Sequence, residues 1–137
     1  MPRPDLCHPQ VVKALEKAGW TIVSSPFSLE TSVNYLYADL QAQRSVEIGD
    51  QEIIVVEVKC FTDDDTTMHE LYVSIGQYLI YRHVLQINGL TDPIYLAVPT
   101  KAFYGIVKEI ASPVMVEYRI KLLVIDLEHE EIEQWIE

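Results

Sequence analysis

The chain has 137 residues, of which 49% are hydrophobic, and this composition excludes a disordered protein and fits one folded domain over residues 1–137. With 21 acidic and 10 basic residues, the net charge is −11, which argues against a protein that binds nucleic acid alone through a broad basic surface. The sequence has no apolar stretch long enough to span a bilayer and no apolar signal core, so we expect a cytoplasmic protein that does not enter a membrane.

The first half of the sequence predicts one helix followed by three strands. Apolar residues recur at helical spacing over residues 8–18, and Gly19 suits the end of that helix. The predicted strands cover residues 20–23, 35–42 and 53–60, with a turn at residues 47–51. Cys7 and Cys60 have neither metal-ligand nor disulfide spacing, so we expect two buried thiols in a reducing compartment.

The second half predicts alternating helices and strands after an acidic turn at residues 63–65. The expected helices cover residues 68–85 and 101–110, the second ending at Ser112-Pro113. The expected strands cover residues 94–98, 122–125 and, at a sheet edge, 132–136. This order predicts an α/β fold with a central mixed sheet flanked by helices.

The strand over residues 53–60 carries the first chemical signal. Side chains alternate along a strand, so Glu57 and Lys59 lie on the same face as Val55. Asp39 closes the preceding extended stretch, and a sheet would bring it beside Glu57. An acid followed by Glu-x-Lys is the arrangement by which many phosphodiester-cleaving enzymes hold a divalent metal. The pattern therefore indicates a candidate metal site.

Hard oxygen ligands of this kind suit Mg²⁺ or Mn²⁺. Asp39, Glu57 and the backbone carbonyl of Val58 would hold the metal, and Lys59 would lie beside the attacking water. An alternative stays open in which Glu57 and Lys59 form a strand-end salt bridge and Asp39 caps a turn.

The long helix and the N-terminus add further candidates. Gln77 and Tyr81 are one turn apart, so Gln77 could bond the scissile region and Tyr81 a phosphate. Alternatively, Tyr81 is a ring at the edge of the core and Gln77 is solvated. Glu70 falls on the same helix face, and His8 stands where it could cap the first helix. Both are candidate accessory residues.

Several motifs, in order along nearly the whole chain, resemble those of one family. They are Asp5-x-x-His8, Val11-x-x-Ala14-Leu15-x-Lys17-x-Gly19-Trp20-Thr21-Ile22, Leu36-Tyr37-x-Asp39-Leu40, Val56-Glu57-Val58-Lys59-x-Phe61, Glu70, Gly76-Gln77-Tyr78-x-x-Tyr81-Arg82, Tyr95-Leu96-Ala97-Val98-Pro99 and Lys121-Leu122-x-Val124-Ile125-Asp126. The sequence is thereby similar to the fdxN element excision controlling factor proteins, XisH, found mainly in cyanobacteria.

The resemblance implies a restriction-endonuclease-like fold of the PD-(D/E)xK superfamily. Asp39 and Glu57 match the acidic metal ligands of that superfamily, Lys59 matches its lysine, and the spacing from Gln77 to Tyr81 matches its accessory helix motif. The chain departs from the family pattern at three positions. They are Tyr72 in place of a histidine, Ile80 in place of an asparagine, and Ser25 in place of the acid before Pro26.

The resemblance also implies a role in the programmed excision of a DNA element. The family acts beside a site-specific recombinase and a small companion, XisI. Two functions stay open: a Mg²⁺-dependent DNA endonuclease, and a non-catalytic regulatory module that binds the companion. The net charge of −11 favours the second and implies that DNA is reached with a partner. Exposed apolar strands would also allow a homodimer.

Overall fold

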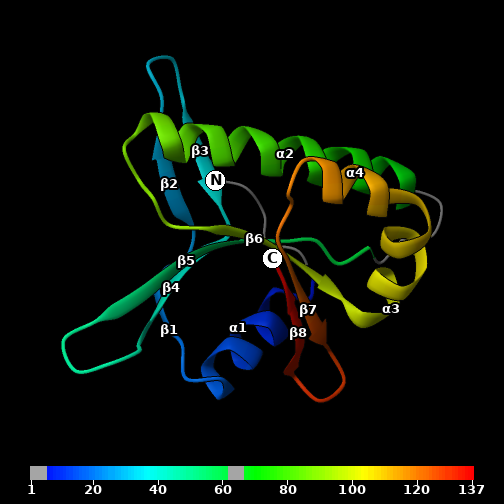
Figure 1. Cartoon of the computed structure of the whole chain (residues 1–137), viewed down its shortest axis with the longest axis horizontal. Coiled ribbons are helices and arrows are strands. Elements are labelled where there is room, and N and C mark those ends of the chain that lie inside the picture. Colours follow the sequence, from blue (N-terminus) through cyan, green and yellow to red (C-terminus); the bar gives the residue numbers. More distant parts are fainter. Residues whose placement is uncertain (1–5, 62–66) are drawn as a thin grey trace.

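A six-stranded mixed sheet forms the centre of the protein in the computed structural model, which describes residues 6–61 and 67–137 (Figure 1). Its strands are β1 (Thr21–Ser24), β4 (Leu40–Ser45), β5 (Gln51–Val58), β6 (Ile94–Pro99), β7 (Leu122–Asp126) and β8 (Glu131–Ile136), in the order β1-β4-β5-β6-β7-β8. β6 pairs parallel with β5 and β7, and the other pairs are antiparallel. The predicted α/β fold with a central mixed sheet flanked by helices is confirmed.

Helices cover both faces of this sheet. Helix α1 (His8–Lys17) covers the lower face in Figure 1, where its Leu15 belongs to the same core cluster as Ile54 and Val56 of β5. Helix α2 (Thr67–Ile87) lies over the other face, where Val55 belongs to the same core cluster as Tyr78. Both sides of β5 are buried because each face of the sheet meets a helical layer.

The prediction of one strand over residues 35–42 is wrong, because the chain forms two strands there. β3 (Tyr35–Ala38) pairs with β2 (Phe27–Glu30) in a separate two-stranded sheet, and β4 begins after Asp39. Ala38 is buried in the core beneath α2, whereas Leu40 is buried in the core against α1. The chain therefore crosses from one layer to the other at Asp39.

Helix α2 extends slightly beyond the predicted residues 68–85. The predicted acidic turn at residues 63–65 lies outside the described residues. Leu71 and Tyr78 of this helix are buried in the core, whereas Met68 is 38% exposed. Gly89, with a φ of +74°, takes the left-handed conformation that commonly follows a helix end.

The helical region after β6 is longer than predicted. It comprises α3 (Thr100–Ala102), η2 (Phe103–Ala111) and α4 (Ser112–Glu117), with non-helical dihedral angles at Gly105. The prediction that helix ends at Ser112-Pro113 is wrong, because Pro113 lies in the first turn of α4, where the missing N–H costs no hydrogen bond. In the described residues, no helix combines the length and apolar character needed to cross a membrane.

Cys7 and Cys60 form a disulfide, so the expectation of two thiols is wrong. Cys7 immediately precedes α1, and Cys60 lies two residues beyond the end of β5. Their Cα atoms are 5.8 Å apart although 53 positions separate them in sequence. The packing of α1 on the sheet brings them together, and sequence spacing holds no information about that contact.

Candidate metal centre

The pairing of β4 with β5 brings Asp39 beside Glu57. Leu40 pairs with Val56 in the antiparallel register, so the residues just before Leu40 and just after Val56 continue it as Asp39 and Glu57. The backbone N–H of Val58 donates a hydrogen bond to Asp39 Oδ2 at 2.6 Å. This bond fixes the Asp39 carboxylate against the end of β5.

Glu57 and Lys59 lie at the C-terminal end of β5, which is flanked by β4 and β6. Glu57 pairs with Leu96 of β6 and is only 6% exposed, and Lys59 is half-buried. The backbone N–H of Lys59 donates to the carbonyl of Ala97 at 3.0 Å, which extends the parallel pairing by one residue. The backbone that carries both side chains is therefore fixed by the sheet.

Tyr81 lies on α2 close enough to sense both carboxylates. Burial, together with the negative charges of Glu57 and Asp39, raises the pKa of Tyr81 to about 12, and burial is the largest of these causes. Its phenol is half-buried and keeps its proton at neutral pH. The structure thus holds a neutral hydroxyl, which can donate a hydrogen bond, within electrostatic reach of two acidic side chains.

Gln77 precedes Tyr81 by one turn on the same side of α2. Its Oε1 atom is buried, and no described residue donates a hydrogen bond to it, which disfavours the alternative that this side chain is solvated. Glu70 is half-buried on the first turn of the helix. Ser74 lies between them in sequence, is fully buried, and donates to the carbonyl of Leu71 at 2.9 Å. This side of α2 therefore faces inward.

His8 reaches the site only through a second residue. The expectation that His8 caps α1 is wrong, since Cys7 occupies the N-cap position and no side chain caps the helix. His8 Nε2 lies 3.2 Å from Ser25 Oγ, and that hydroxyl donates to the backbone carbonyl of Asp39 at 3.2 Å. Ser25 was not among the predicted site residues. The sequence pointed to this position only because the family has an acid there, before Pro26.

Asp39, Glu57, Lys59, Gln77 and Tyr81 are together called the carboxylate site. Its two carboxylates offer hard oxygen donors, which fit Mg²⁺ or Mn²⁺ because such ions keep several waters and substrate phosphates as ligands. Within residues 6–61 and 67–137, no group of three or more His, Cys, Asp or Glu side chains forms a metal-binding cluster.

The comparisons with known proteins agree with one another. The family model described as "XisH protein" matches residues 1–133. The crystal structure of an XisH family protein from Nostoc punctiforme PCC 73102 is 31% identical, with 97% of this chain and 100% of that chain covered and a TM-score of 0.87.

A second crystal structure, of a fdxN element excision controlling factor protein from Anabaena variabilis, is also 31% identical. Here 96% of this chain and 98% of that chain are covered, with a TM-score of 0.85. No curated protein sequence matches significantly. The family model and both structures cover almost the entire chain, which therefore belongs to the XisH family.

Proposed function

We propose that this protein is a controlling factor for the programmed excision of a DNA element and that it acts through a Mg²⁺-dependent phosphodiester site of the PD-(D/E)xK type. The observation that carries the proposal is the placement of Asp39 opposite Glu57, with Lys59 two residues further along the same strand. The link to excision comes from the description of the similar Anabaena variabilis protein.

Each residue of the carboxylate site has a role in this proposal. Asp39 and Glu57 would hold Mg²⁺ or Mn²⁺, with the Val58 carbonyl as a further ligand. The ion, when bound, supplies electrostatic stabilisation of the charge that develops on the phosphate. The N–H of Val58 keeps the Asp39 carboxylate in place.

The remaining side chains would act on water and substrate. Lys59 orients the attacking water and offsets negative charge on the phosphate. The protonated hydroxyl of Tyr81 donates a hydrogen bond to a phosphate oxygen, and the amide of Gln77 orients the scissile region. His8 and Glu70 are accessory, with His8 positioning Asp39 through Ser25.

Metal binding tests the proposal directly. Titration calorimetry with MnCl₂ should show binding to the wild type and its loss in Asp39→Ala and Glu57→Ala. Asp50→Ala is the matched control, because it removes one exposed carboxylate from the β4–β5 turn and should bind Mn²⁺ like the wild type. Equal Mn²⁺ binding by all four proteins would contradict the assignment of the ligands.

A plasmid-nicking assay then asks whether the site cuts DNA. We expect Mg²⁺-dependent nicking by the wild type together with its partner proteins, and its loss in Lys59→Ala with metal binding retained. That outcome would separate the role of Lys59 from the role of the two ligands.

The second candidate function is a non-catalytic regulatory module that works with a XisI-like companion and a site-specific recombinase. The net charge of −11 favours it, because an acidic protein is repelled by DNA phosphates. The deciding experiment is an excision assay with companion and recombinase present, using the triple variant Asp39→Ala, Glu57→Ala and Lys59→Ala. Excision control that survives in this variant would establish the regulatory function and refute the catalytic one.

A further inference from the structure

A concave region lies on the side of α2 opposite to Gln77 and Tyr81. It is a cleft of about 1130 Å³ and shares no lining residue with the carboxylate site. Its wall on α2 consists of residues at positions i, i+3, i+4 and i+7, which form one stripe of a helix. They are Leu79, Arg82, His83 and Gln86.

Apolar side chains line the opposite wall and the floor of this cleft. Phe103 and Val107 come from η2, Met115 comes from α4, and Leu122 and Ile136 come from β7 and β8. Phe103 and Ile136 are partly exposed and provide accessible apolar surface on the floor. Val107, Met115 and Leu122 are at most 4% exposed and join this surface to the core beneath α2.

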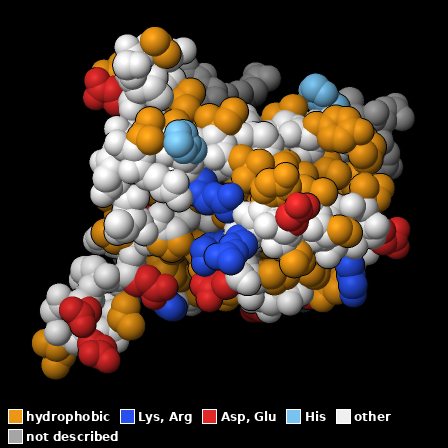
Figure 2. Space-filling model, turned by 45° about the horizontal axis from the view of Figure 1, so that its top comes forward, with side chains coloured by type: hydrophobic (Ala, Val, Ile, Leu, Met, Phe, Trp, Pro, Cys, Tyr) orange, Lys and Arg blue, Asp and Glu red, His pale blue; other side chains and the backbone are white. Residues whose placement is uncertain are grey.

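Basic side chains gather at the same cleft. Arg82, Lys108, Arg119 and Lys121 line it, which is four of the ten Lys and Arg residues in the chain. In Figure 2 the top of the molecule in Figure 1 is turned towards the viewer, and Lys and Arg side chains lie beside apolar ones on this face. We call this region, with its apolar floor and these four residues, the basic cleft.

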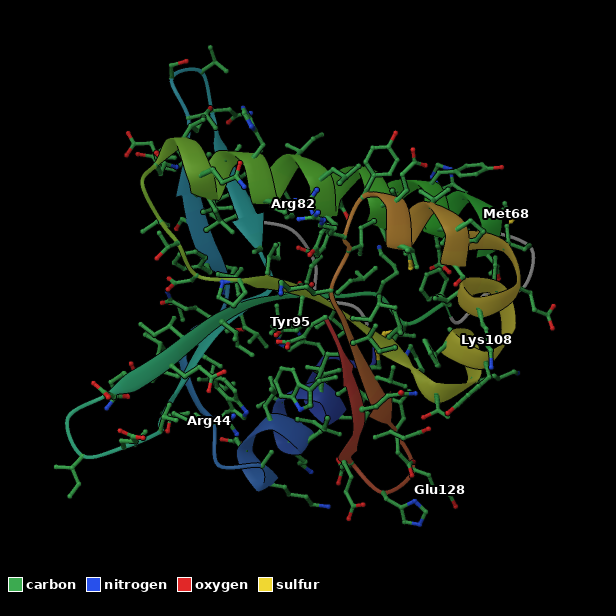
Figure 3. The ribbon with its side chains drawn as sticks, in the orientation of Figure 1. Arg44, Met68, Arg82, Tyr95, Lys108 and Glu128 are labelled. Atoms are coloured by element: carbon green, nitrogen blue, oxygen red, sulfur yellow. A yellow bond between two sulfur atoms is a disulfide. The ribbon has the colours of Figure 1, made fainter. Side chains whose placement is uncertain are left out.

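The two helical walls are tied together across the basic cleft. Arg82 Nη1 donates to the carbonyl of Tyr118 at 2.7 Å and to that of Arg119 at 3.1 Å. Figure 3 shows Arg82 projecting from α2 towards the segment between α4 and β7. These two hydrogen bonds fix the position of α2 relative to the segment that follows α4.

Little negative charge offsets the four cations. In the described parts of the chain, none of the four takes part in an ion pair. Of the two carboxylates at the cleft, that of Glu137 accepts a hydrogen bond from the Tyr95 hydroxyl, and Glu117 is exposed on α4. A positive region persists here in a protein whose net charge is −11.

The dimensions and chemistry of the basic cleft select the class of ligand. Its volume of about 1130 Å³ exceeds the roughly 300–1,000 Å³ typical of small-molecule sites. A nucleic acid offers phosphates but no apolar face for the floor, and a second copy would bring its entire net charge of −11, so a single acidic helix fits this cleft better than either. An apolar floor between two helical walls with cations at its edge matches helix-in-groove recognition.

We propose that the basic cleft docks an amphipathic helix of a partner protein, with its apolar face on the floor and its carboxylates beside Arg119 and Lys121. This interaction is independent of the proposed metal site. An acidic protein can bind a negatively charged helix in this way, because its basic side chains are concentrated at the cleft where the helix would lie.

The test uses the full chain and a synthetic peptide of about 18 residues, or five helical turns. The peptide carries Leu at helical i, i+3, i+4 and i+7 spacing, with Glu flanking the Leu stripe; a second peptide has Lys at every Glu position. By fluorescence anisotropy, we expect the Glu peptide to bind at least about tenfold more tightly than the Lys peptide, with affinity falling as salt is raised.

The paired variant Arg119→Glu/Lys121→Glu should weaken binding of the Glu peptide about tenfold or more. The matched control Lys13→Glu/Lys101→Glu makes the same change of net charge outside the cleft and should bind like the wild type. Circular dichroism checks the fold of both, and Arg119→Gln/Lys121→Gln gives a milder change that should weaken binding to a smaller extent.

Three outcomes would overturn the proposal. The first is equal binding of the two peptides by the wild type. The second is an unchanged affinity for the Glu peptide in Arg119→Glu/Lys121→Glu. The third is that this variant loses binding of duplex DNA, or loses self-association, while it still binds the Glu peptide like the wild type. Asp39→Ala/Glu57→Ala should bind the Glu peptide normally, so failure of the metal site and failure of the docking site can be told apart.

Discussion

The two sides of helix α2 face opposite electrostatic environments, one with two acidic side chains and one with four basic side chains. One side carries Gln77 and Tyr81 towards the paired carboxylates of Asp39 and Glu57. Another side, offset around the same helix, carries Arg82 into the basic cleft. One helix therefore separates a negative site at the sheet end from a positive cleft beneath α4.

This comparison shows that net charge alone describes the protein poorly. The value of −11 argues against unaided binding to DNA, but the charge is sorted locally rather than spread evenly. The carboxylate site suits a cation, and the basic cleft suits an anionic helix. The two regions should respond independently when each is perturbed.

The largest expected effect is on the carboxylate-site side, from the disulfide. Cys7 precedes His8 and Cys60 follows Lys59, so the bond ties α1 to the end of β5. Reduction should lower the free energy of unfolding by about 4 kcal/mol, because the bond closes a long loop in the unfolded chain. Urea unfolding with and without dithiothreitol measures this difference, and peptide binding at the basic cleft should survive reduction.

The control for this prediction is Cys7→Ser/Cys60→Ser, whose stability should not respond to dithiothreitol. Thiol titration confirms that the wild-type protein is reduced. If its urea midpoint is then unchanged, the disulfide does not stabilise the fold. Thiol titration of protein purified under non-reducing conditions, with thiols blocked at lysis, also tests the predicted cytoplasmic location, where disulfides are rare.

A smaller effect is expected at Tyr78, which links β6 to the edge of the basic cleft beneath α2. Its buried hydroxyl donates to the carbonyl of Ile94 at 2.8 Å and accepts from the N–H of Lys121 at 3.0 Å. Tyr78→Phe leaves both groups without this partner and should cost about 1–3 kcal/mol in urea unfolding. The N–H of Lys121, at the basic cleft, should exchange faster with deuterium.

Tyr72→Phe is the matched control, since the Tyr72 side chain is 65% exposed and its change should fall within about 0.5 kcal/mol. If Tyr78→Phe proves as mild as Tyr72→Phe, the hydroxyl does not couple β6 to the edge of the cleft.

The pKa of Tyr81 tests the electrostatic separation itself. In Asp39→Asn/Glu57→Gln, it should fall from about 12 yet stay above the ordinary value, because burial is the larger cause. NMR titration of tyrosine ring carbons measures it. In Arg119→Glu/Lys121→Glu, it should stay unchanged; a comparable shift there would mean that the two sides of α2 share one electrostatic environment.

The same pKa predicts a loss of stability in alkali. The folded-state pKa of Tyr81 lies above its unfolded value of about 10, so its contribution is complete below about pH 10 and is lost as the pH rises towards 12. Urea unfolding across that range should show a weaker pH dependence in Tyr81→Phe than in the wild type.

The smallest effect is expected outside both regions, at the turn between β7 and β8. Asp126 Oδ2 lies 2.8 Å from His129 Nδ1, and this bond lowers the pKa of Asp126 and raises that of His129. The contribution of Asp126 is lost as the pH falls below about 4, and that of His129 as it rises beyond about 6.5. The pair is therefore complete only between these values.

Asp126→Asn should lower the pKa of His129, as measured by NMR, with little change in stability because both side chains are exposed. It should change neither Mn²⁺ binding nor peptide binding. An effect on either would show that the two regions respond to charge changes anywhere on the molecule.

The local patterns predicted much of the secondary structure. The β-branched run before Glu57 and the helical spacing around Tyr78 identified β5 and α2, because a strand or helix with buried faces must repeat its apolar residues. Pro113 misled the prediction, since proline ends a helix interior but suits the first turn of a new helix. The local pattern did not distinguish those positions.

Contacts between distant segments were decided by the tertiary structure. The Cys7–Cys60 disulfide depends on α1 packing on the sheet, and the basic cleft depends on Arg82 meeting the end of α4. By itself, the sequence determined which residues share a strand face or a helix face, including Glu57 with Lys59. Only the fold decided which of these faces meet, because strand pairing and layer packing join residues whose separation along the chain leaves no periodic signal.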